Sequence, residues 1–450
     1  MVQDTNMTQG KPLRLLLFFA LPLMFGNIFQ QLYTVVDIAI IGQGVGMDAL
    51  AALGSVDWLN WMMIGIVQGF TQGFSVRIAQ KYGEGDLPEM RRFIAQAAIL
   101  TAVLSLLYLT LGQLLLPLLL ILLRVPAELS PMAEAYTRTL LLGAPAVMFF
   151  NYCSSVLRAV GDSKTPLKAM IIASIVNIIL DLAAVFGLGL GIAGAGMATN
   201  IAQCVAGGIC AIKIIQNPLL HFGKKELQKN IAILKNLTAI GSPAAAKNVI
   251  ISIGGMAVQT IVNGFGTGFI AGYTATSKLY GLLEIAAISY GYAITTYVGQ
   301  NYGAGKPERI REGVRSAGKL SVATSVVIAG IMFLFGRSIT ALFISTEIPA
   351  LAAEAKHVAY CFLCVMSAFL PVLYLLYVYL SALQGMGYTG ITLISGIIEF
   401  LIRLIIAFII GLSGFEMGIF CAEIIAWIGA AVYLMIHYYR KIALLDPACH

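Results

Sequence analysis

Charged residues are scarce in this chain. Asp, Glu, Lys and Arg together make up 11% of its 450 residues, whereas soluble globular proteins contain about 25%. Hydrophobic residues reach 59%, and the mean hydropathy is +0.89. The alternation of apolar and polar residues that marks outer-membrane β-barrels is also missing. The sequence therefore predicts an all-α integral membrane protein and excludes a soluble globular domain.

Residues typical of catalytic and metal sites are equally scarce. The four histidines have no metal-ligand spacing. GLGIAG (189–194) matches a nucleotide motif only in its letters, since it lies between apolar runs, where we expect a tight hairpin. YGAGK (302–306) lacks the Ser or Thr of a phosphate-binding loop. For the CxxC at Cys361 and Cys364, burial as apolar side chains and a redox or metal role are both open, and burial is the simpler interpretation. We expect no enzyme and no cofactor, and an ion gradient as the energy source.

Long apolar runs dominate the sequence. Each is long enough for the roughly 20 helical residues that cross a bilayer, because only a helix satisfies its own backbone hydrogen bonds in lipid. The twelve predicted spans are about 15–42, 49–76, 93–123, 132–157, 167–188, 193–216, 237–263, 269–299, 318–343, 356–382, 389–411 and 417–439. The first run is too long for the apolar part of a signal peptide, so we interpret it as an uncleaved helix.

The basic residues follow the predicted membrane topology. Twenty-one Lys and Arg residues lie in segments on the side of the N-terminus, against four on the opposite side. The positive-inside rule then places both termini in the cytoplasm, as in a multi-pass protein of a prokaryotic cytoplasmic (inner) membrane. The net charge of +7 therefore reflects topology and does not indicate nucleic-acid binding.

The two halves of the chain repeat each other. QKYGEGDLPEMRR (80–92) aligns with QNYGAGKPERIRE (300–312), and LRAVGDSKTP (157–166) aligns more weakly with LQGMGYTGIT (383–392). The polar segment 217–236 separates six predicted helices from the next six. We therefore predict two pseudo-symmetric six-helix bundles, a lobe at 1–216 and a lobe at 237–450, joined by a cytoplasmic linker. Such a plan is typical of transporters.

Two acids mark the apolar spans of the first half. Ionisable groups there cost roughly 2.5–3.5 kcal/mol each and usually mark function. Asp37 and Asp181 lie on polar helical faces. Further polar residues occupy these faces or the next span: Gln30, Tyr33, Ser174, Asn177, Thr199 and Gln203. In the three spans that carry these residues, Lys and Arg occur only near the ends, so the carboxylates must take up protons or hold a cation such as Na⁺. The alternative is that these groups only fix helix packing.

The second half does not repeat the acidic face, since Val258 stands at the position that corresponds to Asp37. Arg403 follows Glu399 by four residues, so the two are expected to pair on one helix. A structural ion pair is the simpler interpretation, and a role in transport stays open.

Two more acids lie in the spans of the second half. For Glu284 a transport role and pairing with Lys278 or Lys247 are both open, and Glu423 ranks lower as a candidate.

The six-plus-six plan, the YG-x-G motif after the second helix of each half and the motif at 157–166 together resemble the multidrug and toxic compound extrusion (MATE) family. The resemblance covers almost the whole chain and is greatest to the prokaryotic branch with the DNA-damage-inducible F (DinF) and MepA exporters. It implies antiport that expels cationic, amphiphilic compounds in exchange for inward Na⁺ or H⁺, by a protein that acts as a monomer in the lipid bilayer. The residues that match the cation site of the family are Asp37, Asn177, Asp181 and Thr199. Pro22 matches a proline that some proposals link to bending of the first helix.

Apolar and aromatic residues of the spans suit variable, greasy cargo, because such side chains repack around different shapes. Candidates for lining a substrate path are Trp58, Trp61, Met62, Met63 and Phe150. Packing or contact with lipid is the competing role for each of them.

Two rival functions also remain. One is a flippase for lipids or lipid-linked oligosaccharides, which would need a basic cavity. The other is a membrane receptor or channel, which would not need an ion site in one lobe.

Overall fold

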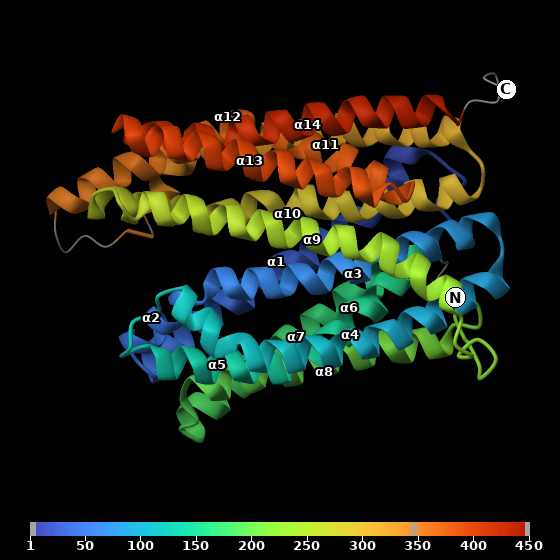
Figure 1. Cartoon of the computed structure of the whole chain (residues 1–450), viewed down its shortest axis with the longest axis horizontal. Helices are drawn as coiled ribbons and strands as arrows, with labels where there is room; N and C mark the ends of the chain where they lie inside the picture. Colours follow the sequence, from blue (N-terminus) through green and yellow to red (C-terminus); the bar gives the residue numbers. More distant parts are fainter. Residues whose placement is uncertain (1–5, 342, 345–348, 446–450) are drawn as a thin grey trace. The chain divides into compact units, whose positions relative to one another are not determined.

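The computed structural model describes residues 6–341, 343–344 and 349–445. Figure 1 shows that the described residues form long helices joined by short turns, with no strand among them. The helices are α1 (Pro12–Gly44), α2 (Met47–Ser55), α3 (Asp57–Glu84), α4 (Leu87–Leu122), α5 (Ser130–Leu142), α6 (Ala144–Ala159), α7 (Lys164–Leu182), α8 (Gly191–Gln216), α9 (Ile231–Val262), α10 (Thr267–Gly303), α11 (Pro307–Ala341), α12 (Pro349–Gly385), α13 (Thr389–Ser413) and α14 (Phe420–Ala443). A π-helical turn (Ala183–Gly187) follows α7, and a 3₁₀ turn (Glu416–Ile419) precedes α14. The all-α prediction is confirmed.

Nine helices within the described ranges are long and apolar enough to cross a membrane, and eleven spans result if each of two bent pairs counts as one. The remaining predicted span, 269–299, is part of α10, a continuous helix of 37 residues. This helix carries Lys278, Glu284 and many small or hydroxyl-bearing residues, so it is less apolar than the other spans.

Two predicted spans are bent rather than straight. The run 49–76 is divided into α2 and α3, which meet at 49°, and the run 132–157 is divided into α5 and α6, which meet at 46°. At the second bend, a Cβ on Gly143 would lie 1.7 Å from Oδ1 of Asn200. Only glycine fits there, so the bend in this span depends on a close contact with α8 that the apolar pattern does not reveal.

The repeated motifs adopt the same backbone conformation in both halves. Gly85 and Gly305 follow the YG-x-G helices with φ of 78° and 64°, and Gly161 and Gly387 lie in the other motif pair with φ of 94° and 90°. Non-glycine residues are strained in this left-handed region. The aligned glycines thus end corresponding helices with the same turn.

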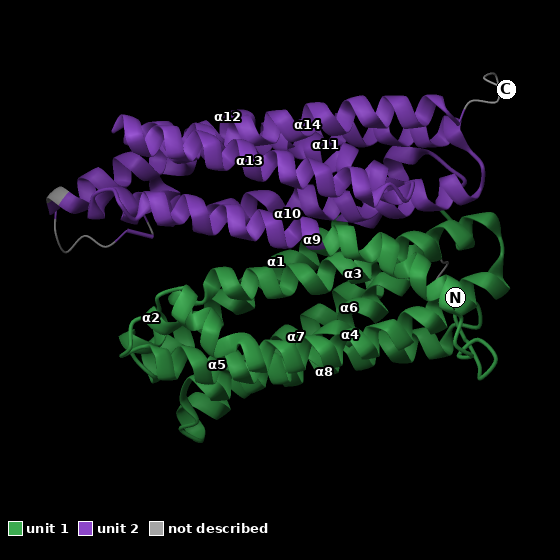
Figure 2. Ribbon diagram, viewed as in Figure 1, with its two compact units in different colours: residues 1–6, 21–245 green, residues 7–20, 246–450 purple. Residues whose placement is uncertain are grey.

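The chain folds into two compact units, coloured separately in Figure 2. Most of unit 1 is Leu21–Ala245, and unit 2 contains Met7–Ala20 and Ala246–His450. The division therefore falls inside α1 and α9, next to Pro22 and Pro243, and not in the linker 217–236. The first turns of α9 pack closely on α3 in unit 1, where a Cβ on Gly69 would lie 2.4 Å from Cα of Ala245.

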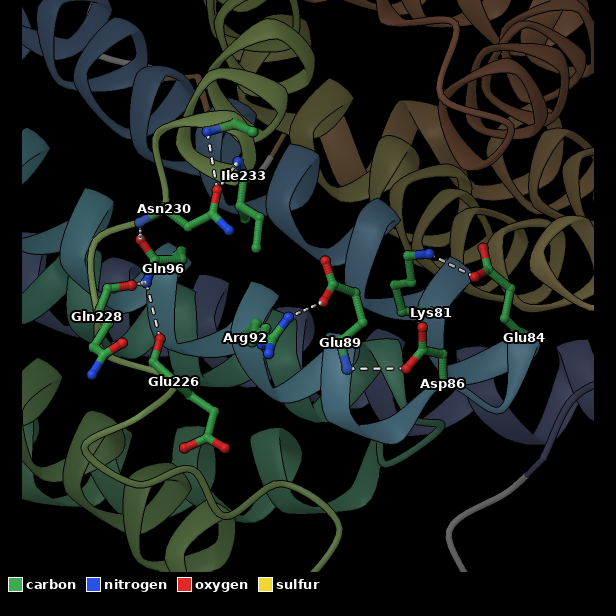
Figure 3. Close-up of polar contacts among 11 residues, drawn as sticks. Lys81, Glu84, Asp86, Glu89, Arg92, Gln96, Glu226, Gln228, Asn230 and Ile233 are labelled. Atoms are coloured by element: carbon green, nitrogen blue, oxygen red, sulfur yellow. Dashed lines mark hydrogen bonds and ion pairs between the residues drawn. The ribbon is translucent and has the colours of Figure 1, made fainter.

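The end of the linker before α9 is held by a glutamine of α4, as Figure 3 shows. Nε2 of Gln96 donates to the carbonyl oxygens of Glu226 and Gln228, both at 2.9 Å, and Oε1 accepts from the backbone N–H of Asn230 at 3.1 Å. Gln96 is fully buried. A hydrogen bond from the backbone N–H of Gly223 lowers the pKa of the exposed Glu226 carboxyl. The predicted linker is therefore an ordered segment.

Candidate ion-coupling site

The polar faces predicted on three helices converge inside unit 1. Asp37 lies on α1, Asp181 in the last turn of α7, and Gln203 on α8. Asp37 is 5% exposed and Asp181 is completely buried. The two carboxyl groups are close enough to interact electrostatically with each other. The structure therefore brings together the two acids, 144 positions apart, that the sequence singled out.

Five buried side-chain oxygens around the two acids have no hydrogen-bond partner. They are both carboxylate oxygens of Asp181, Oδ1 of Asp37, Oδ1 of Asn177 and Oε1 of Gln203, and all are buried. A buried acceptor without a donor costs about 1–3 kcal/mol, and more if it is charged. These oxygens are suited to a proton on one carboxylate or to a hard cation held between them.

The remaining members of the predicted group fill different roles. Nδ2 of Asn177 lies 3.5 Å from Oγ1 of Thr199, at the limit of a hydrogen bond. Tyr33 is half-buried and packs against the apolar core of unit 1. Ser174 donates to the carbonyl oxygen of Met170 at 2.8 Å within its own helix. Ser174 thus donates its proton to the backbone, whereas the buried amide oxygen of Asn177 has no partner.

Chain geometry next to Asp181 is irregular. The α-helix α7 ends one residue later, and the π-helical turn Ala183–Gly187 follows. Such turns are rare and often occur at functional sites. Gly189 and Gly191 then close the connection to α8 with positive φ values of 63° and 59°, so GLGIAG forms the tight hairpin that was predicted.

The acids of unit 2 are paired instead. Nη2 of Arg403 lies 2.7 Å from Oε1 of Glu399 and 2.8 Å from Oε2 of Glu423. The pairing of Glu399 with Arg403 was predicted from their spacing of four residues. Glu423 on α14, which the sequence indicated only as a weaker candidate, is the second partner of Arg403. Only the packing of α14 against α13 brings Glu423 there, and no spacing in the sequence indicates it.

Glu284 has a separate set of neighbours on α9, α10 and α12. It accepts hydrogen bonds from the hydroxyls of Tyr377 and Tyr280. Lys247 is 9% exposed and interacts electrostatically with Glu284 and Glu399. Of the two lysines considered, Lys247 therefore faces these acids, while Lys278 is exposed on α10. Unit 2 thus contains buried bases beside its acids, and the group around Asp37 does not.

Comparison with known proteins places the chain in a family. A family model described as MatE matches residues 22–183 and 243–409. The chain belongs to the MatE family. It is therefore a membrane transporter and not an enzyme.

Relatives of this MatE chain carry names that refer to drug resistance. The probable multidrug resistance protein YpnP of Bacillus subtilis is 29% identical over 343 residues, which cover 76% of each chain. The probable multidrug resistance protein NorM of Thermotoga maritima is 26% identical and covers 92% of this chain and 88% of its own. The structure of a MOP superfamily transporter from Pyrococcus furiosus superposes with a TM-score of 0.92 at 22% identity and 99% coverage of both chains. That likeness shows the shared fold.

The predicted substrate-lining residues of the MatE chain differ in exposure. Trp58 and Trp61 are exposed, Met62 and Met63 are half-buried, and Phe150 lies in the core of unit 1. Phe150 is thus a packing residue. Cys361 and Cys364 are free and half-buried, in contrast to the expected burial. No cluster of three potential metal-binding side chains occurs within the described ranges.

Proposed function

We propose that this protein is a cation-coupled antiporter that exports cationic, amphiphilic compounds across a prokaryotic cytoplasmic membrane in exchange for inward H⁺ or Na⁺. One observation supports this most strongly. Asp37 and Asp181 are buried together in unit 1 with unpaired oxygens around them, and none of the described basic side chains forms an ion pair with either acid.

The burial of these acids makes the state of unit 1 depend on the coupling ion. An uncompensated carboxylate in a low-dielectric interior costs several kcal/mol, even after the surroundings relax. A proton or a Na⁺ ion removes this cost and is held more tightly in whichever conformation buries the pair. Such a difference in affinity between two conformations is what allows an ion to shift their equilibrium. Loss of the ion then favours the conformation that hydrates the carboxylates.

In this account each residue of the group has a defined task. Asp37 and Asp181 carry the charge that alternates between free and neutralised. Asn177 and Gln203 supply neutral oxygens that could complete the coordination of Na⁺. Thr199 holds the amide nitrogen of Asn177, which turns the amide oxygen away from Thr199. Both termini are proposed to be cytoplasmic, from the distribution of basic residues.

The proposal is tested in bacteria that lack their own exporters and express the chain. Wild type should lower the accumulation of ethidium and raise resistance to it. Asp37→Asn and Asp181→Asn should each abolish most of this efflux, at unchanged protein abundance. Asp48→Asn changes an exposed carboxylate in the first turn of α2 and should leave efflux as in wild type.

The coupling ion is identified by measuring ethidium efflux after the proton gradient or the sodium gradient has been collapsed, one at a time. If both buried-acid variants export ethidium as fast as wild type, the assignment of the site is wrong. If wild type exports no compound in such a panel, the efflux function itself is wrong.

A further inference from the structure

An apolar pocket in unit 1 lies apart from the ion-coupling group and shares no residue with it. Its volume is about 370 Å³, and it is lined by α3, α4, α5 and α6. Met62 and Met63 come from α3, and Leu107 and Leu111, which are about half exposed, come from α4. The exposed leucines belong to an apolar helix long enough to cross the membrane, so the pocket is reached from the hydrocarbon side.

The bend between α5 and α6 shapes one wall of this pocket. Leu141 precedes the bend and Met148 follows it, and both line the pocket. Leu141 packs on Gly112 so closely that a Cβ there would lie 2.4 Å from Cδ2 of Leu141. The pocket is therefore bounded by packed, fully buried side chains on this side.

One polar side chain among the residues that line the pocket has no hydrogen-bond partner. Thr137 is completely buried in α5 and lines the pocket, and its Oγ1 makes no hydrogen bond. This is unusual for a helical threonine, which commonly donates to a carbonyl one turn earlier. Thr139 on the same helix does so, at 2.8 Å from the carbonyl oxygen of Ala135. A buried hydroxyl without a partner is unfavourable, so Thr137 would gain from a ligand that offers one hydrogen-bonding atom.

The lining also restricts the charge of such a ligand. None of the residues that line the pocket carries a charge, and Tyr108 is the only other one with a hydroxyl. A cation would lose its hydration there without gaining a counter-charge. A saturated acyl chain would fill the apolar space but leave Oγ1 of Thr137 unpaired. The side chains that line the pocket therefore suit an uncharged, mostly apolar compound with a single hydrogen-bonding group.

We propose that this pocket binds uncharged, apolar compounds of drug size from the bilayer, with Thr137 as the residue that recognises their one polar group. The methionines suit this role, because their flexible side chains adapt to ligands of different shape. This binding does not require the antiport mechanism to be correct, and it extends the range of ligands beyond the cations expected at Asp37 and Asp181.

The test uses 1-aminoanthracene, which is uncharged at neutral pH, and anthracene, which lacks the amine. Both are titrated into the full-length protein in lipid nanodiscs, and the saturable part of the fluorescence change is analysed. Wild type should bind one equivalent of 1-aminoanthracene. Thr137→Val should weaken that binding about tenfold, which corresponds to about 1.4 kcal/mol, and should leave the binding of anthracene unchanged.

Two further variants complete the test. Thr139→Val removes a hydroxyl that is already paired within the helix and should leave both affinities as in wild type. Met62→Trp fills part of the pocket and should abolish saturable binding of both compounds, with a wild-type elution profile in size-exclusion chromatography as the check on folding. Equal affinities of wild type and Thr137→Val for 1-aminoanthracene would overturn the proposal, as would equal binding of the two ligands by wild type, which indicates a pocket for hydrocarbon chains. Absence of saturable binding would overturn it as well, and none of these results bears on the ion-coupling site.

Discussion

Removal of Arg403 should destabilise unit 2 more than removal of either acid that it binds. The guanidinium is 4% exposed, and its Nη2 contacts Glu399 at 2.7 Å and Glu423 at 2.8 Å. Arg403→Met leaves Glu423 buried without its base. Loss of one partner of a buried ion pair costs about 3–5 kcal/mol, because the remaining charge stays out of water. Glu423→Gln keeps the contact between Arg403 and Glu399, so it should cost only about 1–2 kcal/mol.

The free energy of unfolding is measured by SDS titration of the purified protein in mixed micelles. Arg315→Met serves as the control, because Arg315 is exposed on α11 and its replacement should change stability by less than about 0.5 kcal/mol. The triple variant Arg403→Met, Glu399→Gln, Glu423→Gln removes all three charges and should recover part of the loss. The reasoning is refuted if Arg403→Met is no less stable than Glu423→Gln.

Other predictions concern unit 1 and its linker. Gly69→Leu should prevent the close packing of α3 on α9 and cost about 1–3 kcal/mol, seen as a lower melting temperature in size-exclusion assays; a wild-type melting temperature would contradict the observed contact. Gln96→Ala should free the linker segment 223–230, so limited trypsin digestion should cut there several times faster, and an unchanged rate would show that Gln96 does not hold it. The contact of Glu226 with Gly223 depends on the carboxylate, whose pKa is lowered in the folded protein. It should therefore be complete above the ordinary glutamate value of about 4.3 and be lost as the pH falls through the lower folded value. Hydrogen exchange at Gly223, corrected for intrinsic rates, should show constant protection from pH 8 to pH 5, and a loss within that range would contradict this.

The sequence predicts the helices of the protein well, because apolar runs in a membrane protein have few alternatives to helical structure. It also predicts which residues form the acidic group, since residues at spacings of three, four and seven share a helical face. The glycines of the repeated motifs occur where left-handed turns require them. These features depend on local spacing, which a single sequence displays directly.

Features that depend on contacts between helices could not be predicted in the same way. The bend at Gly143 follows from its contact with Asn200 on another helix, and Glu423 reaches Arg403 only through the packing of α14 on α13. The orphan hydroxyl of Thr137 looks like any other helical threonine in the sequence. The division of α1 and α9 between the two units is equally invisible, although Pro22 and Pro243 lie close to it.

The central claim is that ion movement through the protein depends on the buried pair Asp37 and Asp181. Its most direct test is ion flux driven by substrate in proteoliposomes that contain the purified protein. In proteoliposomes with the wild-type protein, an imposed ethidium gradient should drive H⁺ or Na⁺ across the membrane in the opposite direction. We expect this flux to vanish in Asp37→Asn and Asp181→Asn and to persist in Asp48→Asn. A counterflow of ions that is undiminished in both buried-acid variants would contradict the account.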